Sequence, residues 1–450
     1  MLPTKSSRQQ AVFWGSVAIL LLLGGVLHLA HSGILVSHPE FFLTPIIQQA
    51  TMYSFLLASV LTAIALLVWL IKHGIHKGTR HAFLHARILS GVRRALLEAR
   101  YYIEEGNGSC KLARLPRLKL TLENDCINGV LRIENHVRFE KRYETIPLSS
   151  CLGHFIVDQH YLTDSQNEVI FEISDSREQR QIIFDNADVF QYFSMETCGS
   201  YELFLDGISN VPLGHSLIVG QTGSGKTYAL YSLILQMLGK STPYNLYFAD
   251  PKASSLAILG DKVSMENTAE TVDDIISLLR RFHSAMEYRK PEVKAGLSAK
   301  LDDTYADLGL SPHVLIVDEF SSFQACVATM DRKVRDEVAS LLKGIVMQGR
   351  QLGFFLWIVM QKSDAASITT DIRDNLVTKI VLGQSERTTY ETAFGVSAVA
   401  NIPNRRYLPG QGVFTCPGVT LQGHPKLCYF PTLRFDILDA IQGLYKDASS

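Results

Sequence analysis

The sequence has no closely spaced cysteine pair. Its seven cysteines are scattered along the chain, and none of them lies in a CxxC motif. Zinc sites use clustered cysteine or histidine ligands, and disulfide frameworks use even sets of cysteines, so this pattern disfavours both. It is typical of a protein whose folded body stays in a reducing cytosol.

An excess of charge of either sign is also lacking. The 43 Lys and Arg residues nearly balance the 44 Asp and Glu residues, for a net charge of −1. A protein that coats nucleic acid over its whole surface carries a basic excess, so any DNA contact is expected in a local loop or channel. No internal repeat or low-complexity tract is found. The 450 residues suffice for two or three domains, and a mean hydropathy of +0.10 favours a membrane segment attached to them.

Two long runs contain no charged side chain, Ala11–Ala30 and Thr51–Ile71. Each has about 20 residues, enough for a helix to cross a bilayer. The loop between them, residues 31–50, has no Lys or Arg, whereas Lys5 and Arg8 precede the first run and several basic residues follow the second. The positive-inside rule then predicts a cell-membrane protein with two spans and both termini in the cytoplasm. A cleaved signal peptide and a pair of buried core helices are the alternative interpretations.

The segment after the second run is basic. Between residues 72 and 100, seven Lys and Arg residues stand against one acid, Glu98, and four histidines lie among them. A solvated juxtamembrane helix that touches anionic membrane lipid is one interpretation, and a collar that guides DNA is the other. From 116 to 200, short alternating strands separated by turn residues predict a small β-rich (α+β) module. It shows no catalytic constellation, so a spacer, an oligomerisation platform and a docking surface all stay open.

From residue 201 onwards, strand and helix patterns alternate, which is typical of an α/β domain built on a mostly parallel sheet. A buried strand, HSLIVG, runs into a glycine-rich loop that a helix follows. This order of strand, loop and helix is the context that a phosphate-binding loop for ATP requires. The loop consists of Gly220, Gln221, Thr222, Gly223, Ser224, Gly225, Lys226 and Thr227. Backbone amides of the loop are expected to surround the phosphates, with Lys226 at the β- and γ-phosphates and Thr227 as a ligand of Mg²⁺.

A second apolar strand, HVLIV, ends in Asp318 and Glu319. Ligands bind at the carboxyl edge of such sheets, so Asp318 is expected to hold Mg²⁺ and Glu319 to act as the base that polarises the attacking water. An ordinary strand that ends in two solvated acids is the alternative. The adjacent glutamate favours hydrolysis over passive binding.

Three further positions are candidates for the same site. The strand NLYFA ends in Asp250-Pro251-Lys252, and the strand FFLWIVM ends at Gln361, whose amide is expected to sense the γ-phosphate or orient water. The segment GRQLG, which is predicted to join a helix to that strand, exposes Arg350. This arginine is a candidate to reach the phosphates of a neighbouring subunit, and a solvated loop arginine is the alternative.

These motifs, together with GRQLGFFLWIVMQKSDA and IRDNLVTKIVLG, resemble the FtsK/SpoIIIE-type DNA translocases. Within that family the chain is most similar to the membrane-anchored coupling ATPases of Gram-positive conjugative plasmids and integrative conjugative elements. The resemblance implies a RecA-like P-loop NTPase fold and a homo-hexameric ring that moves DNA by hydrolysing ATP. It also implies as partners a relaxase or relaxosome and the proteins of a type IV secretion channel.

The chain departs from the family pattern in places. Lys379 stands where many family members have an arginine, which puts a phosphate-sensing role there in doubt. Chromosome-segregating relatives add further spans, a long linker and a winged helix, and we expect no winged helix within residues 201–450. Chromosome segregation, specialised protein secretion and a nucleotide-dependent docking scaffold are the alternative functions. No LSGGQ-like stretch precedes Asp318, which disfavours an ABC transporter.

The expected order of parts follows from these patterns. It is a cytoplasmic tail (1–10), a first transmembrane helix (11–30), an extracytoplasmic loop (31–50), a second transmembrane helix (51–71), a basic juxtamembrane linker (72–115), the β-rich module (116–200) and the ATPase motor (201–450).

Overall fold

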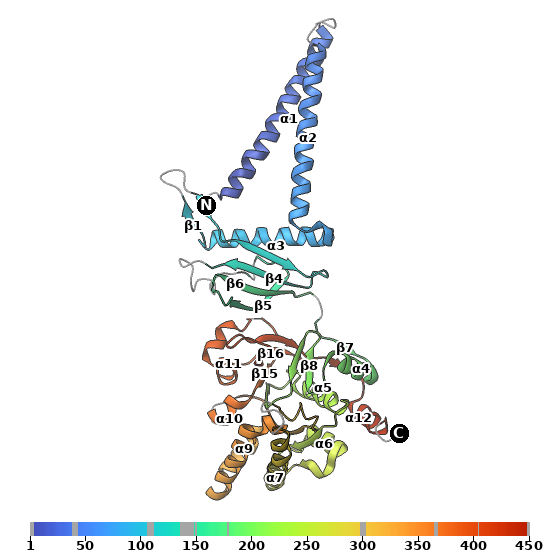
Figure 1. Cartoon of the computed structure of the whole chain (residues 1–450), viewed down its shortest axis with the longest axis vertical. Helices are drawn as coiled ribbons and strands as arrows, with labels where there is room; N and C mark the ends of the chain where they lie inside the picture. Colours follow the sequence, from blue (N-terminus) through green and yellow to red (C-terminus); the bar gives the residue numbers. More distant parts are fainter. Residues whose placement is uncertain are drawn as a thin grey trace. The chain divides into compact units, whose positions relative to one another are not determined.

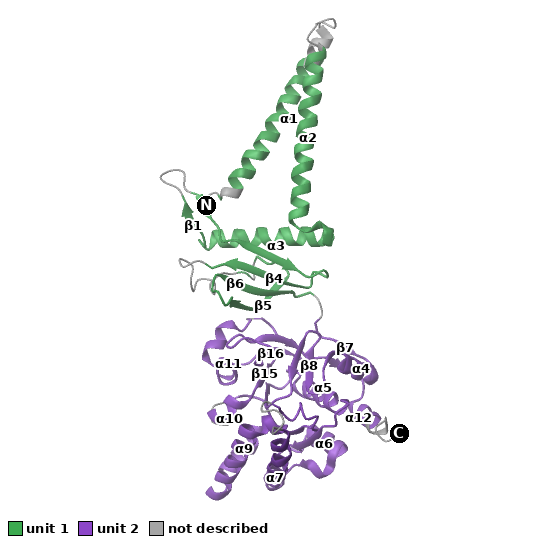
Figure 2. Ribbon diagram, in the orientation of Figure 1, with its two compact units in different colours: residues 1–178 green, residues 179–450 purple. Residues whose placement is uncertain are grey.

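A computed structural model describes residues 4–37, 44–105, 112–135, 148, 151–177, 180–297, 303–363, 368–403 and 405–447. The chain divides into two compact units, residues 1–178 (unit 1) and 179–450 (unit 2), which Figure 2 draws in different colours. Each unit has its own buried core. Because the core of unit 2 includes Phe184 and Phe190, residues 179–200 belong with the ATPase motor and not with the β-rich module to which the strand pattern assigned them.

The first unit begins with two long helices (Figure 1). They are α1 (Lys5–Ser37) and α2 (Thr44–Lys72), and each contains a stretch long and apolar enough to cross a membrane, Ser7–Ala30 and Pro45–Lys72. Both helices are longer than the apolar runs predicted, so they take up most of the expected loop 31–50, whose residues 38–43 lie outside the described part. The helices approach closely at small residues: a Cβ on Gly24 would lie 2.5 Å from Ser54 Oγ. Small residues of this kind let helices pack in a membrane, where no hydrophobic force drives them together.

The rest of unit 1 is an antiparallel sheet with one helix against it. The 3₁₀ turn η1 (Ile75–Lys77) leads into α3 (Thr79–Glu98), so much of the predicted linker is helical. The strands are β1 (Ile103–Glu105), β2 (Leu112–Arg114), β3 (Leu118–Leu122), β4 (Asn128–Glu134), β5 (Phe155–Leu162) and β6 (Glu168–Asp175), and the last four pair in the order β3-β4-β6-β5. The apolar face of α3, with Ile88, Val92 and Leu96 buried, packs on sheet residues that include Leu131 and Phe171. This burial fixes α3 to the sheet.

Unit 2 is built on a mixed eight-stranded sheet in the order β12-β11-β13-β14-β10-β15-β16-β17. All neighbouring pairs from β12 to β15 are parallel, and β16 and β17 add antiparallel pairs at one edge. The strands are β7 (Ile183–Phe184), β8 (Glu202–Asp206), β9 (Ser209–Pro212), β10 (Ser216–Gly220), β11 (Asn245–Ala249), β12 (Thr268–Ala269), β13 (His313–Val317), β14 (Phe354–Met360), β15 (Thr378–Leu382), β16 (Gln411–Thr415), β17 (Lys426–Tyr429) and β18 (Thr432–Leu433). Every residue of β10 and β14 is buried, as expected for central strands covered on both faces. The mostly parallel α/β sheet predicted from the alternating pattern is confirmed.

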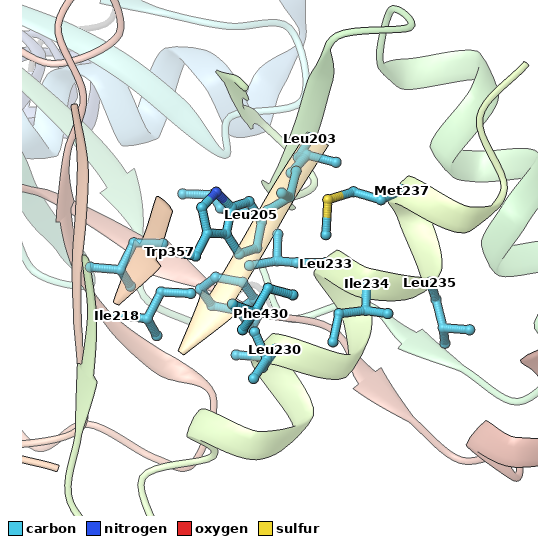
Figure 3. Packing of buried hydrophobic residues seen from close by; sticks show 14 of the residues in the cluster. Leu203, Leu205, Ile218, Leu230, Leu233, Ile234, Leu235, Met237, Trp357 and Phe430 are labelled. Atoms are coloured by element: carbon cyan, nitrogen blue, oxygen red, sulfur yellow. The ribbon is translucent and has the colours of Figure 1, made fainter. Parts of the chain in front are cut away.

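Helices cover this sheet and carry its connections. They are α4 (Ala187–Thr197), α5 (Lys226–Leu238), α6 (Ser255–Ser264), α7 (Val272–Leu297), α8 (Phe320–Ala328), α9 (Arg332–Leu352), α10 (Thr370–Asn375), α11 (Arg387–Phe394) and α12 (Ile437–Asp447), with 3₁₀ turns η5 (Met265–Asn267) and η6 (Val396–Asn401). Figure 3 shows the centre of the core, where Leu230 and Leu233 of α5 pack near Ile218 of β10 and Trp357 of β14. The core therefore holds the helix that follows the glycine-rich loop rigidly against the strand that precedes it.

A buried histidine, His215, makes the stability of this core depend on pH. His215 is 1% exposed, and its Nδ1 accepts a hydrogen bond of 2.9 Å from the backbone N–H of Leu356. Burial, helped by the charge of Arg350, lowers the pKa of His215 to about 3, whereas an unfolded histidine has a pKa of about 6.5. Below pH 6.5 the unfolded chain therefore takes up a proton that the folded chain refuses.

We expect the stability of unit 2 to fall as pH drops from 6.5 towards 3, by up to about 1.4 kcal/mol per pH unit for this histidine. Above pH 7 the histidine is neutral in both the folded and the unfolded chain, so its titration no longer changes the stability. The measurement is the free energy of unfolding at pH 7.5 and pH 5.5 for the parent and for His215→Gln, which has no imidazole to titrate. A smaller loss in the variant is expected, and an equal loss in both proteins would contradict the assignment.

Candidate functional site

The predicted phosphate loop lies between β10 and α5. Gly220 ends the strand, Lys226 begins the helix, and Gly223 and Gly225 adopt φ values of 84° and 88°, which other residues rarely adopt. The first backbone amides of α5 have no partner within the helix and point out of its amino end, where anions bind. Thr227, in the first turn, is exposed. The loop therefore has the geometry of an anion cradle.

A buried hydroxyl inside the loop also fits an anion. Ser224 is 8% exposed, its backbone N–H donates to Gln221 O at 3.0 Å, and its Oγ has no hydrogen-bond partner within the described parts of the chain. A Cβ on Gly220 would lie 2.4 Å from this oxygen, so only glycine leaves room for it there. An unsatisfied buried hydroxyl is costly unless a ligand completes it.

The phosphate loop contacts a Pro-Gly segment, residues 409–410, whose place beside the loop the sequence did not indicate. The backbone N–H of Gly410 donates to Ser224 O at 2.8 Å, and Gln181 Nε2 donates to Pro409 O at 3.1 Å. A Cβ on Gly225 would lie 2.3 Å from the nitrogen of Gly410. Pro409 and Gly410 directly precede β16. No local sequence pattern predicts where that strand lies in the sheet. The Pro-Gly pair is a turn signal, but nothing in the sequence places that turn beside the phosphate loop.

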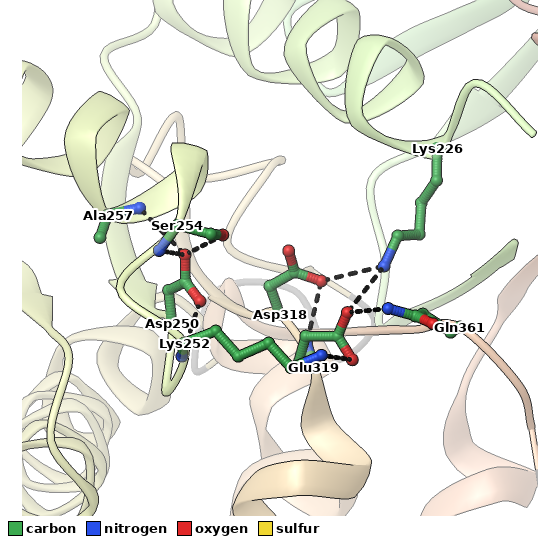
Figure 4. A network of polar contacts seen from close by, with 8 residues as sticks. All are labelled: Lys226, Asp250, Lys252, Ser254, Ala257, Asp318, Glu319 and Gln361. Carbon is green, nitrogen blue, oxygen red and sulfur yellow. Dashed lines mark hydrogen bonds and ion pairs between the residues drawn. The ribbon is translucent and has the colours of Figure 1, made fainter. Parts of the chain in front are cut away.

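The two acids of the HVLIVDEF motif lie beside Lys226 (Figure 4). Lys226 Nζ is 3.3 Å from Asp318 Oδ1 and 3.8 Å from Glu319 Oε1, and the three side chains are 11–15% exposed. Parallel strands β10 and β13 end at the same edge of the sheet, which brings together groups that are 92 residues apart in the chain. Glu319 has a φ of 46°, a strained conformation for a side chain of this size. Strain of this kind is concentrated at functional sites.

Glu319 is held at both of its carboxylate oxygens. Gln361 Nε2, from the end of β14, donates to Oε1 at 2.7 Å, as Figure 4 shows. Lys252 Nζ lies 3.2 Å from Oε2. The pairing of Gln361 with Glu319 agrees with the expectation that it belongs to this edge. Lys252 lay in the Asp-Pro-Lys motif, but its contact with Glu319 depends on the sheet order, which places β11 next to β13.

Asp250 plays a different part from its neighbour Lys252. It is fully buried, and its carboxylate accepts hydrogen bonds from the backbone N–H groups of Lys252, Ser254 and Ala257 and from the hydroxyl of Ser254. These bonds shape the turn that leads into α6. Asp250 is therefore a structural carboxylate that positions Lys252.

The electrostatics of Asp318 fit a bound cation. Burial raises the pKa of its carboxyl above the ordinary value, and the charge of Lys226 acts in the opposite direction. A buried carboxylate of this kind gains when a further cation arrives. No cluster of three or more His, Cys, Asp or Glu side chains that could hold a metal occurs in the described residues. Mg²⁺ does not need such a cluster, because it usually takes one or two protein oxygens and completes its shell with phosphates and water. The Asp318 carboxylate and the Thr227 hydroxyl are oxygen donors of the type it takes.

Arg350 lies away from this edge. The segment GRQLG is not a loop: α9 continues to Leu352, and Gly353 alone makes the turn, with a φ of 76°. The helix therefore absorbs the predicted connection, although Arg350 is exposed as expected. Its charge acts on His215, which precedes the amino end of β10, whereas the phosphate loop follows the carboxyl end. Within one chain, Arg350 is not brought to the phosphate loop, and its action on a neighbouring subunit stays a prediction.

Comparisons with known proteins agree with this geometry. Residues 180–345 match the model of the FtsK/SpoIIIE family. The Ftsk domain-containing protein YdcQ of Bacillus subtilis (strain 168) is 34% identical over 183 residues, which cover 41% of this chain and 37% of that protein. The DNA translocase FtsK of Vibrio parahaemolyticus is 26% identical over 244 residues, which cover 46% of this chain and 23% of the relative. The match thus spans less than two fifths of the length of these relatives.

Two solved structures are also similar. The pCW3 conjugation coupling protein TcpA, in a monomer form with ATPgS, overlaps 79% of this chain and 99% of its own, with 17% identity and a TM-score of 0.48. The cytoplasmic domain of the Type VII secretion ATPase EccC of Thermomonospora curvata overlaps 52% of this chain and 28% of its own, with 18% identity and a TM-score of 0.39.

The family-model match covers the glycine-rich loop and the acid pair, which the structure brings to one edge of the sheet. The resemblance inferred from the motifs is therefore confirmed, and residues 180–345 of this chain are similar to the domain that defines the FtsK/SpoIIIE family.

Proposed function

We propose that this protein is a membrane-anchored DNA translocase driven by ATP hydrolysis. The observation that carries the proposal is the contact of Lys226 with Asp318 and Glu319 at the edge of an FtsK/SpoIIIE-type domain. Curated relatives that match this domain are named DNA translocases. The two apolar helices at the start of the chain supply the anchor.

The residues at the carboxyl edge of the sheet have separate roles in the proposed reaction. Backbone amides of the loop from Gly220 to Gly225, including those of Gln221, Thr222, Gly223 and Ser224, hold the phosphates of ATP. Lys226 leaves its contacts with Asp318 and Glu319 and moves to the β- and γ-phosphates. Thr227 and Asp318 would hold Mg²⁺, which would neutralise the charge that develops on the phosphates.

Glu319 is the proposed general base. Its carboxylate lies beside Lys226 and is aimed by Gln361 and Lys252. Once Lys226 turns to the phosphates, the Glu319 carboxylate is free of its contact with that lysine and can accept a proton from the attacking water. Gln361 orients that water through its amide. Arg350 is proposed to act only across a subunit boundary, in a homo-hexamer.

The finer role that we propose is that of a coupling protein, which delivers relaxase-bound DNA to a conjugative type IV secretion channel. The support is the likeness of the motifs to coupling ATPases together with the two-span anchor, which holds the motor at the bilayer that DNA has to cross. Both termini then lie in the cytoplasm, because the basic residues flank the two spans on that side. The partners are DNA, a relaxase or relaxosome, and the channel proteins.

Stimulation of ATP hydrolysis by DNA tests this proposal. Residues 201–450 carry 24 Lys and Arg against 26 Asp and Glu, so DNA contact is confined to a few residues and its effect is expected to depend on salt. We expect the full-length protein in nanodiscs to hydrolyse ATP at least several-fold faster with single- or double-stranded DNA, and the two forms identify the substrate. Equal rates with and without DNA would refute the proposal. A rise only with a secreted protein would instead indicate a secretion ATPase.

A further inference from the structure

A cavity of about 730 Å³ opens at the start of α1 in unit 1. Its walls come from four elements: Ser7 and Gln10 of α1, Arg93 and Arg94 of α3, the end of β1 at Glu105, and the segment of β2 around Arg114. Thr4 pairs with Ala113 in an isolated β-bridge, which fastens the beginning of α1 to β2. The cavity is therefore a feature of the folded unit, and it is large enough for a small ligand or a lipid headgroup.

The charge of the cavity is positive. Among the described residues that line it, Glu105 is the acid, and Glu105 Oε1 is 3.1 Å from Arg114 Nη1. The charges of Glu105 and Arg114 therefore cancel each other. Arg93 and Arg94 are both exposed and contribute two further guanidinium groups that no acid of the lining balances. Guanidinium groups bind phosphate oxygens in a bidentate manner.

The beginning of α1 adds to this field. Ser7 and Thr4 cap the helix reciprocally: the Ser7 N–H donates to Thr4 Oγ1 at 3.0 Å, and the Thr4 N–H donates to Ser7 Oγ at 2.9 Å. No acid lies in the first turn of the helix. The amino end of α1 therefore presents its partial positive charge at the cavity, in addition to the two arginines.

The position of the cavity along the chain indicates what fills it. The apolar stretch that α1 offers to a membrane begins at Ser7, which is itself a wall residue. With α1 in a bilayer, as the proposed anchor requires, its first turn lies at the depth of the cytoplasmic headgroups. Leucines of the wall, such as Leu97 and Leu112, offer apolar surface beside the arginines. A charged group with an apolar continuation matches this lining.

We propose that this cavity binds the phosphate headgroup of an anionic phospholipid from the cytoplasmic leaflet. The inference rests on the proposed membrane anchor but not on DNA translocation. A nucleic-acid backbone is the less suitable occupant, because the wall includes the end of a helix that begins at the membrane surface. The bound lipid would tie α3, β2 and the first span together, and so link the membrane to the sheet of unit 1.

The test compares ligands on the purified full-length protein in a neutral detergent. Probes are phosphatidylglycerol, phosphatidylcholine, inorganic phosphate and a short DNA duplex, with binding followed by thermal shift and by native mass spectrometry. The double variant Arg93→Gln/Arg94→Gln removes the two charges, and Arg80→Gln/Arg87→Gln removes two exposed charges of the same helix that do not line the cavity.

We expect phosphatidylglycerol to bind the parent and the Arg80/Arg87 variant equally. Loss of Arg93 and Arg94 should weaken that binding roughly 10- to 30-fold, since it removes the two guanidinium groups that line the cavity and can bind the phosphate oxygens. Equal binding by both variants would overturn the site, and so would binding of free phosphate as tight as that of the lipid, or a loss confined to DNA. Membrane extraction separates the two failures: a chain that washes off with alkaline carbonate refutes the anchor, whereas an embedded chain without lipid preference refutes only this site.

Discussion

Lys226→Ala is expected to abolish ATP turnover, with at least about a 100-fold loss of kcat/KM. The lysine begins α5 directly behind the glycine-rich loop, so its ammonium is the one cation that the loop itself delivers to the phosphates. Its ammonium also lies 3.3 Å from Asp318 Oδ1. Its removal therefore leaves two acids facing an incoming triphosphate, and repulsion adds to the lost attraction.

The measurement is binding of a fluorescent ATP analogue together with steady-state hydrolysis. Lys262→Ala, at an exposed position of α6, is the matched control, since it removes the same charge from the same unit without touching the site. If Lys226→Ala bound and hydrolysed ATP within about twofold of the control, the assignment of the phosphate loop would be wrong.

Glu319→Gln is expected to separate binding from chemistry. The amide keeps the size of the side chain and one oxygen to accept the hydrogen bond from Gln361, but it cannot take a proton from water. Loss of a general base typically costs 10² to 10⁴ in rate, about the range expected here for kcat. Affinity for ATP should persist, because Lys226 and the loop are unchanged.

Single-turnover hydrolysis and equilibrium binding measure the two effects separately. The control for the loss of a carboxylate is Glu337→Gln. It breaks an exposed ion pair between Glu337 of α9 and Arg280 of α7. Hydrolysis by Glu319→Gln at the parental rate would show that another group activates the water.

The site could be predicted from the sequence where a single segment carries its own geometry. In the phosphate loop, glycines that allow the turn stand directly before Lys226 and Thr227. In the second motif, the two acids stand directly after the apolar strand that places them. Lys252 and Gly410 lack that property. Both reach the site only because β11 lies next to β13 and because β16 returns antiparallel beside β15, and strand order is a long-range result of packing.

The limits of the elements were predicted less well than their presence. The two apolar runs marked the centres of α1 and α2, but polar residues at the ends continue the helices, because backbone hydrogen bonds extend a helix beyond its apolar stretch. The boundary between the units was predicted after residue 200, but it lies after residue 178. The short strand β7 pairs with β18, close to the carboxyl end of the chain, and so belongs to unit 2. The segment around Arg350 was predicted to join a helix to the next strand, yet α9 continues through Gly349, which packs against β14 and His215.

Displacement of a third DNA strand from a triplex tests the central claim most directly, because it reports movement along DNA and not merely hydrolysis. The full-length protein with ATP is expected to displace the third strand, at a rate that rises with duplex length available for loading, while Glu319→Gln with ATP displaces none. Rapid ATP hydrolysis by the parent with the triplex left intact would contradict the coupling of this ATPase to DNA movement.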